Sequence, residues 1–256
     1  MSVGLNAQGV FMSLIAGMGM MGSALFAGNP ILVKAPVEKV FVPLGFDTND
    51  NVEVFYHGHF PNSCYKVGPA KASLDEKNKV ISVQASAYYY PGSFCAQMLV
   101  PFSGSIKMGI MPEGEYSVAV DGDGQVTEAA LQIKIASSPN PDDFLYAPVE
   151  SIKVINDPEK ESDIQLKIEG TYPFMFVGCM VLRDLKTSLT PGNVIVVQPV
   201  AELVDGPECL SQADDKRFSY IKPLGFSPKK EEYLLHARST SGSSVNRVID
   251  FRYGFE

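Results

Sequence analysis

The sequence predicts an all-β protein made of two tandem antiparallel β-sandwiches, each closed by its own disulfide. Three observations support this fold class: an internal repeat, alternation of apolar and polar side chains with a period of two, and four cysteines at matching positions of the two copies. A chain of 256 residues is long enough for two domains of about 100–120 residues, each with its own core.

The repeat consists of short matches that occur in the same order in both copies. The shift between partners starts at about 112 residues and grows to about 117, so the gaps have the size of loops. The clearest matches are Ala-Pro-Val-Glu at residues 35–38 and 147–150, Gly-x-x-Pro at residues 58–61 and 170–173, Val-Ile-x-Val-Gln at residues 80–84 and 194–198, Pro112 with Pro228, and Tyr116 with Tyr233.

Each copy is expected to be a series of short strands separated by turns. In the first copy, alternation places Ile81, Val83, Ala85 and Ala87 on one face of a strand. Seven strands in about 100 residues favour a sandwich. The expected strands are residues 37–42, 52–58, 64–70, 79–88, 94–102, 114–120 and 127–136.

The predicted domain organisation places the first sandwich at residues 35–136 and the second at residues 147–256. The segment between them, residues 137–146, has the composition of a polar linker stiffened by proline.

The N-terminal segment is predicted to be a secretory signal peptide covering residues 1–27. The first 33 residues carry no charged side chain, and the apolar run ends in small residues that allow cleavage after Ala24 or Ala27. A retained membrane anchor is the competing interpretation, but about 18 residues with three glycines are short for a span. A basic residue ahead of the apolar run, typical of signal peptides, is missing.

The cysteines are expected to pair within each copy, as Cys64–Cys95 and Cys179–Cys209. The even count, the matched positions and the apolar leader favour disulfides over free thiols. The closely paired Cys or Cys/His ligands of structural zinc sites do not occur in the sequence. The expected location is therefore the periplasm, the cell surface or the extracellular space.

The motif pattern resembles small immunoglobulin-like sandwich domains of exported bacterial proteins. It consists of a cysteine, the Val-Ile-x-Val-Gln strand, a second cysteine, Pro101-Phe102, and a Pro112-x-Gly114-x-Tyr116 element. The resemblance implies an immunoglobulin-like fold for both copies and a tyrosine corner at Tyr116, whose hydroxyl bonds to nearby backbone. The copies depart from antibody domains because Trp is absent and the cysteine spacing is short; the second copy lacks the Pro-Phe pair.

Composition and motifs argue against several function classes. A net charge of −8 without a dense Lys/Arg run makes a nucleic-acid partner unexpected. Hydrolase, P-loop and dinucleotide-binding motifs are missing from the sequence, so no enzymatic activity and no cofactor are predicted, with a hydrolase at the domain junction as the less favoured alternative.

Two further patterns in the sequence resemble ion-binding sites. His57 and His59 share one strand face and have the spacing of metal ligands. No other histidine is near in sequence, so surface or rim histidines are the preferred interpretation and no metal is predicted. The Asp-Gly-Asp-Gly segment at residues 121–124 is interpreted as a hairpin turn rather than a calcium loop.

The candidate binding residues are Tyr88, Tyr89, Tyr90 and Phe94, just ahead of Cys95. Tyrosines on a loop fixed by a disulfide offer a large contact area at low entropic cost. The competing interpretation is that these rings fill the core of the first copy.

The predicted function is that of an exported, non-enzymatic binding or structural module. The expected partner is another envelope or surface protein, or a glycan, and membrane contact is expected only through the leader. The alternative is a subunit of a surface assembly, or a chaperone-like protein, that uses sandwich edge strands.

Overall fold

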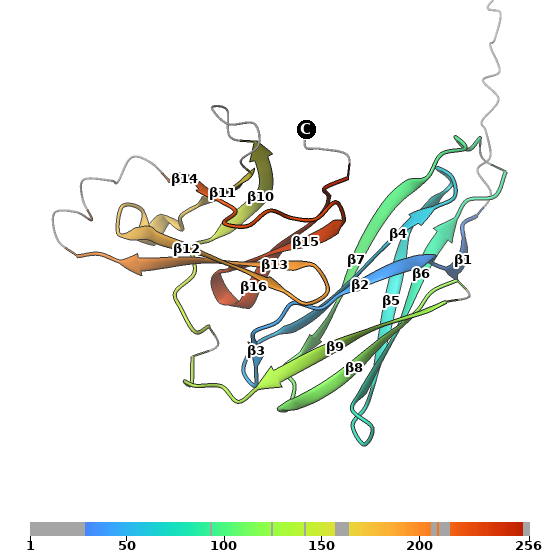
Figure 1. Cartoon of the computed structure of the whole chain (residues 1–256), viewed down its shortest axis with the longest axis horizontal. Helices are drawn as coiled ribbons and strands as arrows, with labels where there is room; N and C mark the ends of the chain where they lie inside the picture. Colours follow the sequence, from blue (N-terminus) through green and yellow to red (C-terminus); the bar gives the residue numbers. More distant parts are fainter. Residues whose placement is uncertain are drawn as a thin grey trace, which may run out of the picture.

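The computed structural model describes residues 29–92, 94–123, 125–140, 142–156, 164–205, 209 and 216–252. The predicted signal peptide, residues 1–27, lies outside this part of the chain. The described residues form β-strands and two short 3-10 segments, η1 (Phe174–Phe176) and η2 (Thr240–Gly242), as Figure 1 shows. In this part of the chain, a helix of the length and apolarity needed to cross a membrane does not occur.

The first half of the chain is a β-sandwich, as the sequence predicted. One sheet has the order β2-β4-β7, and the facing sheet has the order β5-β6-β8-β9-β3, with β1 added beside the C-terminal part of β6. The strands are β1 (Ile31–Lys34), β2 (Val37–Phe41), β3 (Phe46–Asp47), β4 (Val52–Phe60), β5 (Tyr65–Asp75), β6 (Val80–Tyr89), β7 (Val100–Gly109), β8 (Gly114–Asp121) and β9 (Val126–Lys134).

The second half repeats this strand order except for β1 and β3, which have no counterpart among its described strands. One sheet runs β10-β11-β14 and the other runs β12-β13-β15-β16. Each half has its own cluster of buried apolar side chains between its two sheets. The strands are β10 (Val149–Asn156), β11 (Ile164–Thr171), β12 (Met180–Thr190), β13 (Val194–Leu203), β14 (Arg217–Pro223), β15 (Glu232–Ser239) and β16 (Ser243–Asp250).

The smaller sheet of each half is antiparallel, as predicted, whereas the larger sheet also contains parallel pairs that the prediction did not include. Strand β6 pairs with β8 in parallel, and β13 pairs with β15 in parallel. The cause is topological: between each pair the chain crosses to the opposite sheet for one strand and returns in its original direction. The two halves share this feature at the same place in the strand order.

Strand boundaries were predicted correctly in some places and wrongly in others. The inward face of β6 is confirmed, since Ile81, Val83, Ala85 and Ala87 are all buried. The expected strand at residues 94–102 is wrong: β7 begins only at Val100, and the preceding apolar residues belong to an exposed loop. Strand β9 ends at Lys134, so the alternation does not extend to Ile135, which is 70% exposed.

A glycine on the central strand of the smaller sheet makes the same close contact in both halves. A β-carbon at Gly58 would collide with the carbonyl oxygen of Pro36 and touch the ring of Phe102. At Gly170 it would collide with the carbonyl oxygen of Pro148 and touch the ring of Phe218. Although the second half lacks the Pro-Phe dipeptide, the ring of Phe218 packs on Gly170 as that of Phe102 packs on Gly58.

Tyr116 makes the backbone contact expected of a tyrosine corner. Its hydroxyl donates a hydrogen bond to the carbonyl oxygen of Pro112 at 2.9 Å. The second half has a related contact in which the hydroxyl of Tyr233 accepts from the backbone N–H of Lys229 at 3.1 Å. Both bonds span four residues and tie a loop to the strand that follows it.

Both predicted disulfides are confirmed. Cys64 pairs with Cys95, and Cys179 pairs with Cys209, which accounts for all four cysteines of the chain. Each bridge joins the two connections that lead from one sheet to the other at the same end of its sandwich. On the chain-entropy model a closed loop of this size stabilises a domain by about 3–4 kcal/mol.

The two sandwiches pack against each other through an apolar seam. The outward face of β4 lies against the outward faces of β13 and β15, a contact region visible at the centre of Figure 1. The buried cluster in the seam consists of Phe41, Phe55, Val194, Val196 and Leu234, with the partly buried Val248 beside it.

The segment predicted as a linker is attached to both sandwiches. Asn49 of the first sandwich donates to the carbonyl oxygens of Ser138 and Asn140 at 2.9 and 2.7 Å. At the other end of the segment, Tyr146 is buried and forms an isolated antiparallel β-bridge with Val200 on β13. The segment therefore contacts both halves and is not a free linker between them.

Candidate functional site

The predicted aromatic segment at the end of β6 divides between packing and exposure. The ring of Tyr89 is half-buried and lies 4.9 Å from that of Tyr65, which in turn stacks on Phe60 at 5.5 Å. Tyr90 is half-buried under the ammonium group of Lys66, 5.4 Å from the ring centroid. Two of the four candidate rings therefore make local packing contacts, although neither belongs to the buried core of the first sandwich, which the competing interpretation had them fill.

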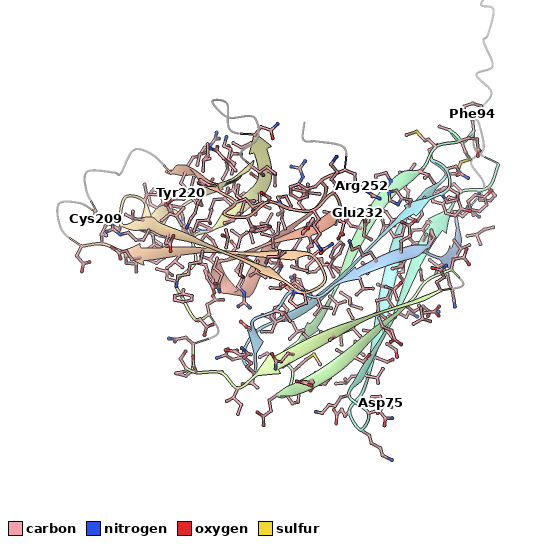
Figure 2. The ribbon with its side chains drawn as sticks, viewed as in Figure 1. Asp75, Phe94, Cys209, Tyr220, Glu232 and Arg252 are labelled. Carbon is pink, nitrogen blue, oxygen red and sulfur yellow. A yellow bond between two sulfur atoms is a disulfide. The ribbon has the colours of Figure 1, made fainter. Side chains whose placement is uncertain are left out.

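The other two candidates face solvent. Tyr88 is 37% exposed and Phe94 is fully exposed. Phe94 lies at one extremity of the first sandwich, opposite the β5–β6 turn marked by Asp75 (Figure 2). Other exposed apolar side chains occupy the same end, which we call the first apolar end; its members are Ile31, Leu32, Val67, Tyr88, Phe94, Met98 and Leu99.

The loop of the first apolar end is fixed at its middle. The Cys64–Cys95 bridge holds it covalently, and Ala96 exchanges two hydrogen bonds with Ser63. The exposed side chains of Phe94 and Met98 thus flank an anchored point. A loop held in this way loses less conformational entropy when it binds a partner.

A second apolar end occurs in the second sandwich, and sequence reasoning missed it. Phe174 and Met175 of η1 are 84% and 75% exposed, and both precede Cys179 closely in the chain. The sequence predicted aromatic binding residues only in the first half, just ahead of Cys95. The exposed aromatic of the second half instead comes from the β11–β12 connection. Cys209 and Phe94 lie at opposite extremes of the molecule in Figure 2.

Several polar side chains are buried in the seam between the sandwiches, and the sequence did not predict their burial. Two strand faces oppose each other there: Glu53, Phe55, His57 and His59 from β4, and Glu232, Leu234, His236 and Arg238 from β15. The residues of each set are two apart, so their side chains lie on the same face of the strand. Residues in the alternate positions point into the core of their own sandwich, whereas these sets face the other sandwich.

An ion pair crosses the seam at one end. Arg238 donates from Nη1 to the Asp50 carboxylate at 3.2 Å and from Nη2 to the carbonyl oxygen of Gly45 at 2.6 Å. Arg238 and Asp50 are each about 6% exposed. Burial raises the pKa of Asp50, and the neighbouring guanidinium opposes that rise. Ser244 adds a second crossing contact by donating to Glu53 at 2.7 Å.

His236 is buried in the middle of the seam. Its ring lies about 6 Å from the rings of Phe46 and Phe55, and its Nδ1 is 2.7 Å from Oδ1 of Asn246. Burial lowers the pKa of His236 to about 4, although the Asn246 contact acts in the opposite direction. The imidazole is therefore neutral at physiological pH, with Nδ1–H donating to Asn246.

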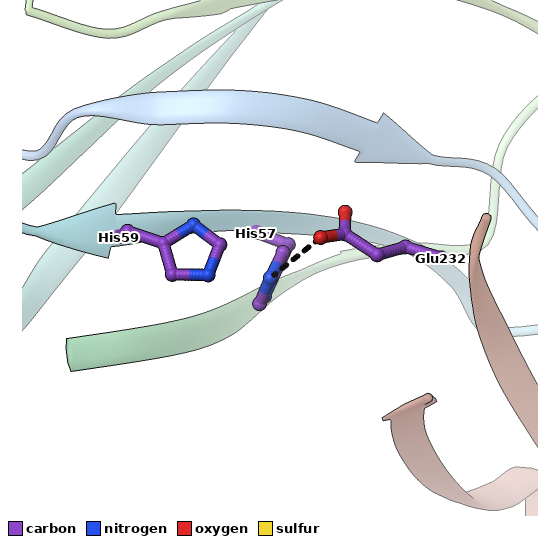
Figure 3. A group of neighbouring side chains, drawn as sticks. All are labelled: His57, His59 and Glu232. Atoms are coloured by element: carbon purple, nitrogen blue, oxygen red, sulfur yellow. Dashed lines mark ion pairs between the residues drawn. The ribbon is translucent and has the colours of Figure 1, made fainter. Parts of the chain in front are cut away.

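At the other end of the seam, His57, His59 and Glu232 form a compact group, shown in Figure 3. One potential ligand atom from each side chain lies within 4.8 Å of the others. His57 Nε2 is 4.0 Å from Oε1 of Glu232, and the two imidazole centroids are 5.2 Å apart. Burial lowers the pKa of His57, while Glu232 acts to raise it.

The interpretation of both histidines as surface or rim residues is wrong for His57, whereas His59 fits a rim position. His57 is only 6% exposed, and His59 is partly buried. Their shared strand face was predicted correctly. Glu232 was missed because it reaches the histidines only through the packing of the second sandwich on the first, for which the sequence has no local signal.

The fold and these contacts define a β-sandwich protein with two disulfide-closed halves. Within it, residues 54–131, from β4 to β9 of the first sandwich, match the family model described as the ORF11 beta-sandwich domain. The match covers less than half of the chain. Neither a curated protein nor a solved structure matches the chain.

Proposed function

We propose that this protein is an exported, non-enzymatic binding or structural module that contacts its partners through its apolar ends. We also infer that its halves are two copies of one immunoglobulin-like domain. The same strand order, the matched glycine contacts and the matched disulfides support that duplication.

The observation that carries the proposal is the pair of exposed apolar groups beside the two disulfides. A fully exposed Phe94 with neighbouring Met98 and Leu99 is an unfavourable surface for a protein without a partner. Aromatic and Met side chains are also enriched at protein interfaces. We take the partner to be another envelope or surface protein, with a glycan stacking on the exposed rings as the second ligand class.

The seam supports the structural part of the proposal. Buried apolar side chains and the Arg238–Asp50 pair hold the two sandwiches together. The apolar ends are therefore kept at a fixed spacing on opposite sides of the molecule, which suits a module that connects two partners.

Site-specific photo-cross-linking tests the binding proposal. A photoreactive phenylalanine at Phe94 should give a discrete cross-linked species in envelope preparations. The same group at Glu76, exposed in the β5–β6 turn at the far end of the sandwich, is the matched control. Equal cross-linking at both positions would show that the first apolar end is not a specific contact.

Substitution separates binding from packing. Phe94→Ser should abolish the cross-linked or captured species while the melting temperature stays unchanged, because the side chain is fully exposed. Tyr89→Ala should lower the melting temperature, because its ring packs on Tyr65. A Phe94→Ser variant that retains its partner would rule out the first apolar end as the binding surface.

Strand addition is the second candidate mode, and β1 favours it. This four-residue strand lies at the margin of its sheet and carries exposed Ile31 and Leu32. An exposed edge strand is a template for pairing with another chain. Cross-links that form from Leu32 and not from Phe94 would support this mode over contact through the loop.

Export is tested on the protein recovered from cells. Its N-terminus should lie near Leu25 or Gly28, and non-reducing peptide mapping should recover both disulfides. A membrane-bound species that still begins at Met1 would favour the anchor interpretation of residues 1–27.

A further inference from the structure

We propose that His57, His59 and Glu232 bind one zinc ion across the seam between the two sandwiches. Two imidazoles and a carboxylate are a ligand set that zinc takes readily, with a fourth position left for water or another donor. Nitrogen ligands favour zinc and neighbouring transition metals over calcium or magnesium, which prefer oxygen.

The geometry is close to what a zinc ion needs. Bond lengths of about 2.0–2.2 Å to a tetrahedral zinc place ligand atoms roughly 3.3 Å apart. The potential ligand atoms here already lie within 4.8 Å of one another. Buried His57 is the fixed member, whereas the side chains of His59 and Glu232 are 25% and 13% exposed and have room to move. A small rotamer change in these two closes the remaining distance.

A carboxylate orients one of the imidazoles. Nδ1 of His59 lies 3.0 Å from Oε2 of Glu38. A metal-binding histidine commonly donates its other ring N–H to a carboxylate, which fixes the tautomer and leaves the opposite nitrogen free for the metal. In this arrangement Nε2 of His59 is the ligand atom, and Glu38 is a positioning residue.

Arg252 competes with the metal for Glu232. Its Nη2 is 2.6 Å from Oε1 of Glu232, and it also binds the Asp250 carboxylate at 2.7 Å. Zinc binding therefore either uses the second carboxylate oxygen or displaces Arg252, which keeps Asp250 as its partner. Removing the Arg252 side chain should make Glu232 more available and tighten zinc binding.

The consequence of binding is a bridge between the two sandwiches. His57 and His59 belong to β4 of the first sandwich, and Glu232 begins β15 of the second. Because the complete site exists only when the sandwiches are packed, zinc binding should stabilise the packed arrangement by mass action.

The test uses the exported, disulfide-bonded chain without a metal-affinity tag. Isothermal titration with ZnCl₂ and elemental analysis after dialysis should give one zinc per chain, and zinc should raise the melting temperature. His59→Ala and Glu232→Gln should each weaken binding at least tenfold and abolish the thermal shift. Glu38→Ala should weaken it about 10–100-fold, as expected for a carboxylate that orients a ligand.

Two further variants make the test decisive. Arg252→Ala should bind zinc more tightly than the unaltered chain. Glu169→Gln is the matched control, since Glu169 occupies the position in β11 that corresponds to His57 in β4, and it should leave binding unchanged. A folded chain that takes up no zinc at 100 µM (roughly the weak limit of a specific site) would overturn the proposal. Equal zinc uptake by the unaltered chain and His59→Ala would also overturn it.

Discussion

Because His236 is buried and neutral, the stability of this protein should fall in mild acid. The ring is enclosed between the sandwiches, and burial lowers its pKa to about 4 in the folded protein. In the unfolded chain the same group titrates near 6.5. Between these values the unfolded chain binds more protons, so folding stability falls as the pH drops through this window.

The magnitude follows from the two pKa values. One unit of difference corresponds to 1.36 kcal/mol, so a shift from 6.5 to about 4 amounts to about 3 kcal/mol over the full window. Between pH 7.5 and pH 5 the His236 contribution to the free energy of unfolding should fall by about 2 kcal/mol. That is a substantial part of the roughly 5–15 kcal/mol stability of a typical domain.

The assay is urea denaturation at half-unit steps from pH 7.5 to pH 4.5, comparing the unaltered chain with His236→Asn. The amide nitrogen of Asn stands in for Nδ1 and keeps a donor toward Asn246, but it does not titrate. The variant loses ring contacts and should be less stable at pH 7.5, yet its stability should depend less on pH.

The difference between the two profiles isolates His236, since all other groups titrate in both proteins. His236→Gln supplies a second non-titrating side chain if the Asn variant folds poorly. Parallel profiles for the unaltered chain and both variants would refute the assignment of a buried neutral imidazole at this position.

The remaining predictions concern other buried contacts and use the same denaturation measurement. Arg238→Met should lower the free energy of unfolding by about 3–5 kcal/mol, because it removes the ion-pair partner of the buried Asp50 carboxylate. Adding Asp50→Asn to this variant should restore part of the lost stability; if the effects of the two substitutions simply add, this prediction is contradicted. Gly58→Ala and Gly170→Ala should each lower the free energy of unfolding by more than about 2 kcal/mol, because the added methyl group collides with a backbone carbonyl. If neither substitution changes the stability, the backbone does not approach these glycines so closely. Tyr116→Phe should lower the free energy of unfolding by about 1 kcal/mol through loss of the hydrogen bond to Pro112, and an unchanged urea midpoint would argue against that bond.

Contacts within each sandwich could be predicted from the sequence because their signals are local. Alternation in β6 identified the buried face, and the repeat identified which cysteines pair. The resemblance to immunoglobulin-like domains predicted the bond from Tyr116 to nearby backbone, and the hydroxyl does reach Pro112.

Contacts between the sandwiches could not be predicted in this way. Strand β4 is buried on both faces, so the Glu53, His57 and His59 side of its alternation looked like an ordinary polar surface. Its partners on β15 come from the other half of the chain, and their position depends on how two whole domains pack. The candidate zinc ligand Glu232 was missed for the same reason.

The exposed ends were predicted in part. The aromatic content of the segment before Cys95 predicts a binding surface there, but it does not distinguish Tyr89, which packs on Tyr65, from Phe94, which is exposed. The strand expected at residues 94–102 was misplaced because apolar residues in an exposed loop have the same composition as a buried strand.

The central claim is that the seam makes the two sandwiches one rigid module, and scanning calorimetry tests it most directly. With Phe41, Phe55 and Leu234 buried between the halves, the chain should unfold in a single transition whose calorimetric and van't Hoff enthalpies agree. Leu234→Asp should uncouple the halves and split the transition. Two separate transitions in the unaltered chain would contradict the claim, because the sandwiches would then be independent domains joined only by residues 137–146.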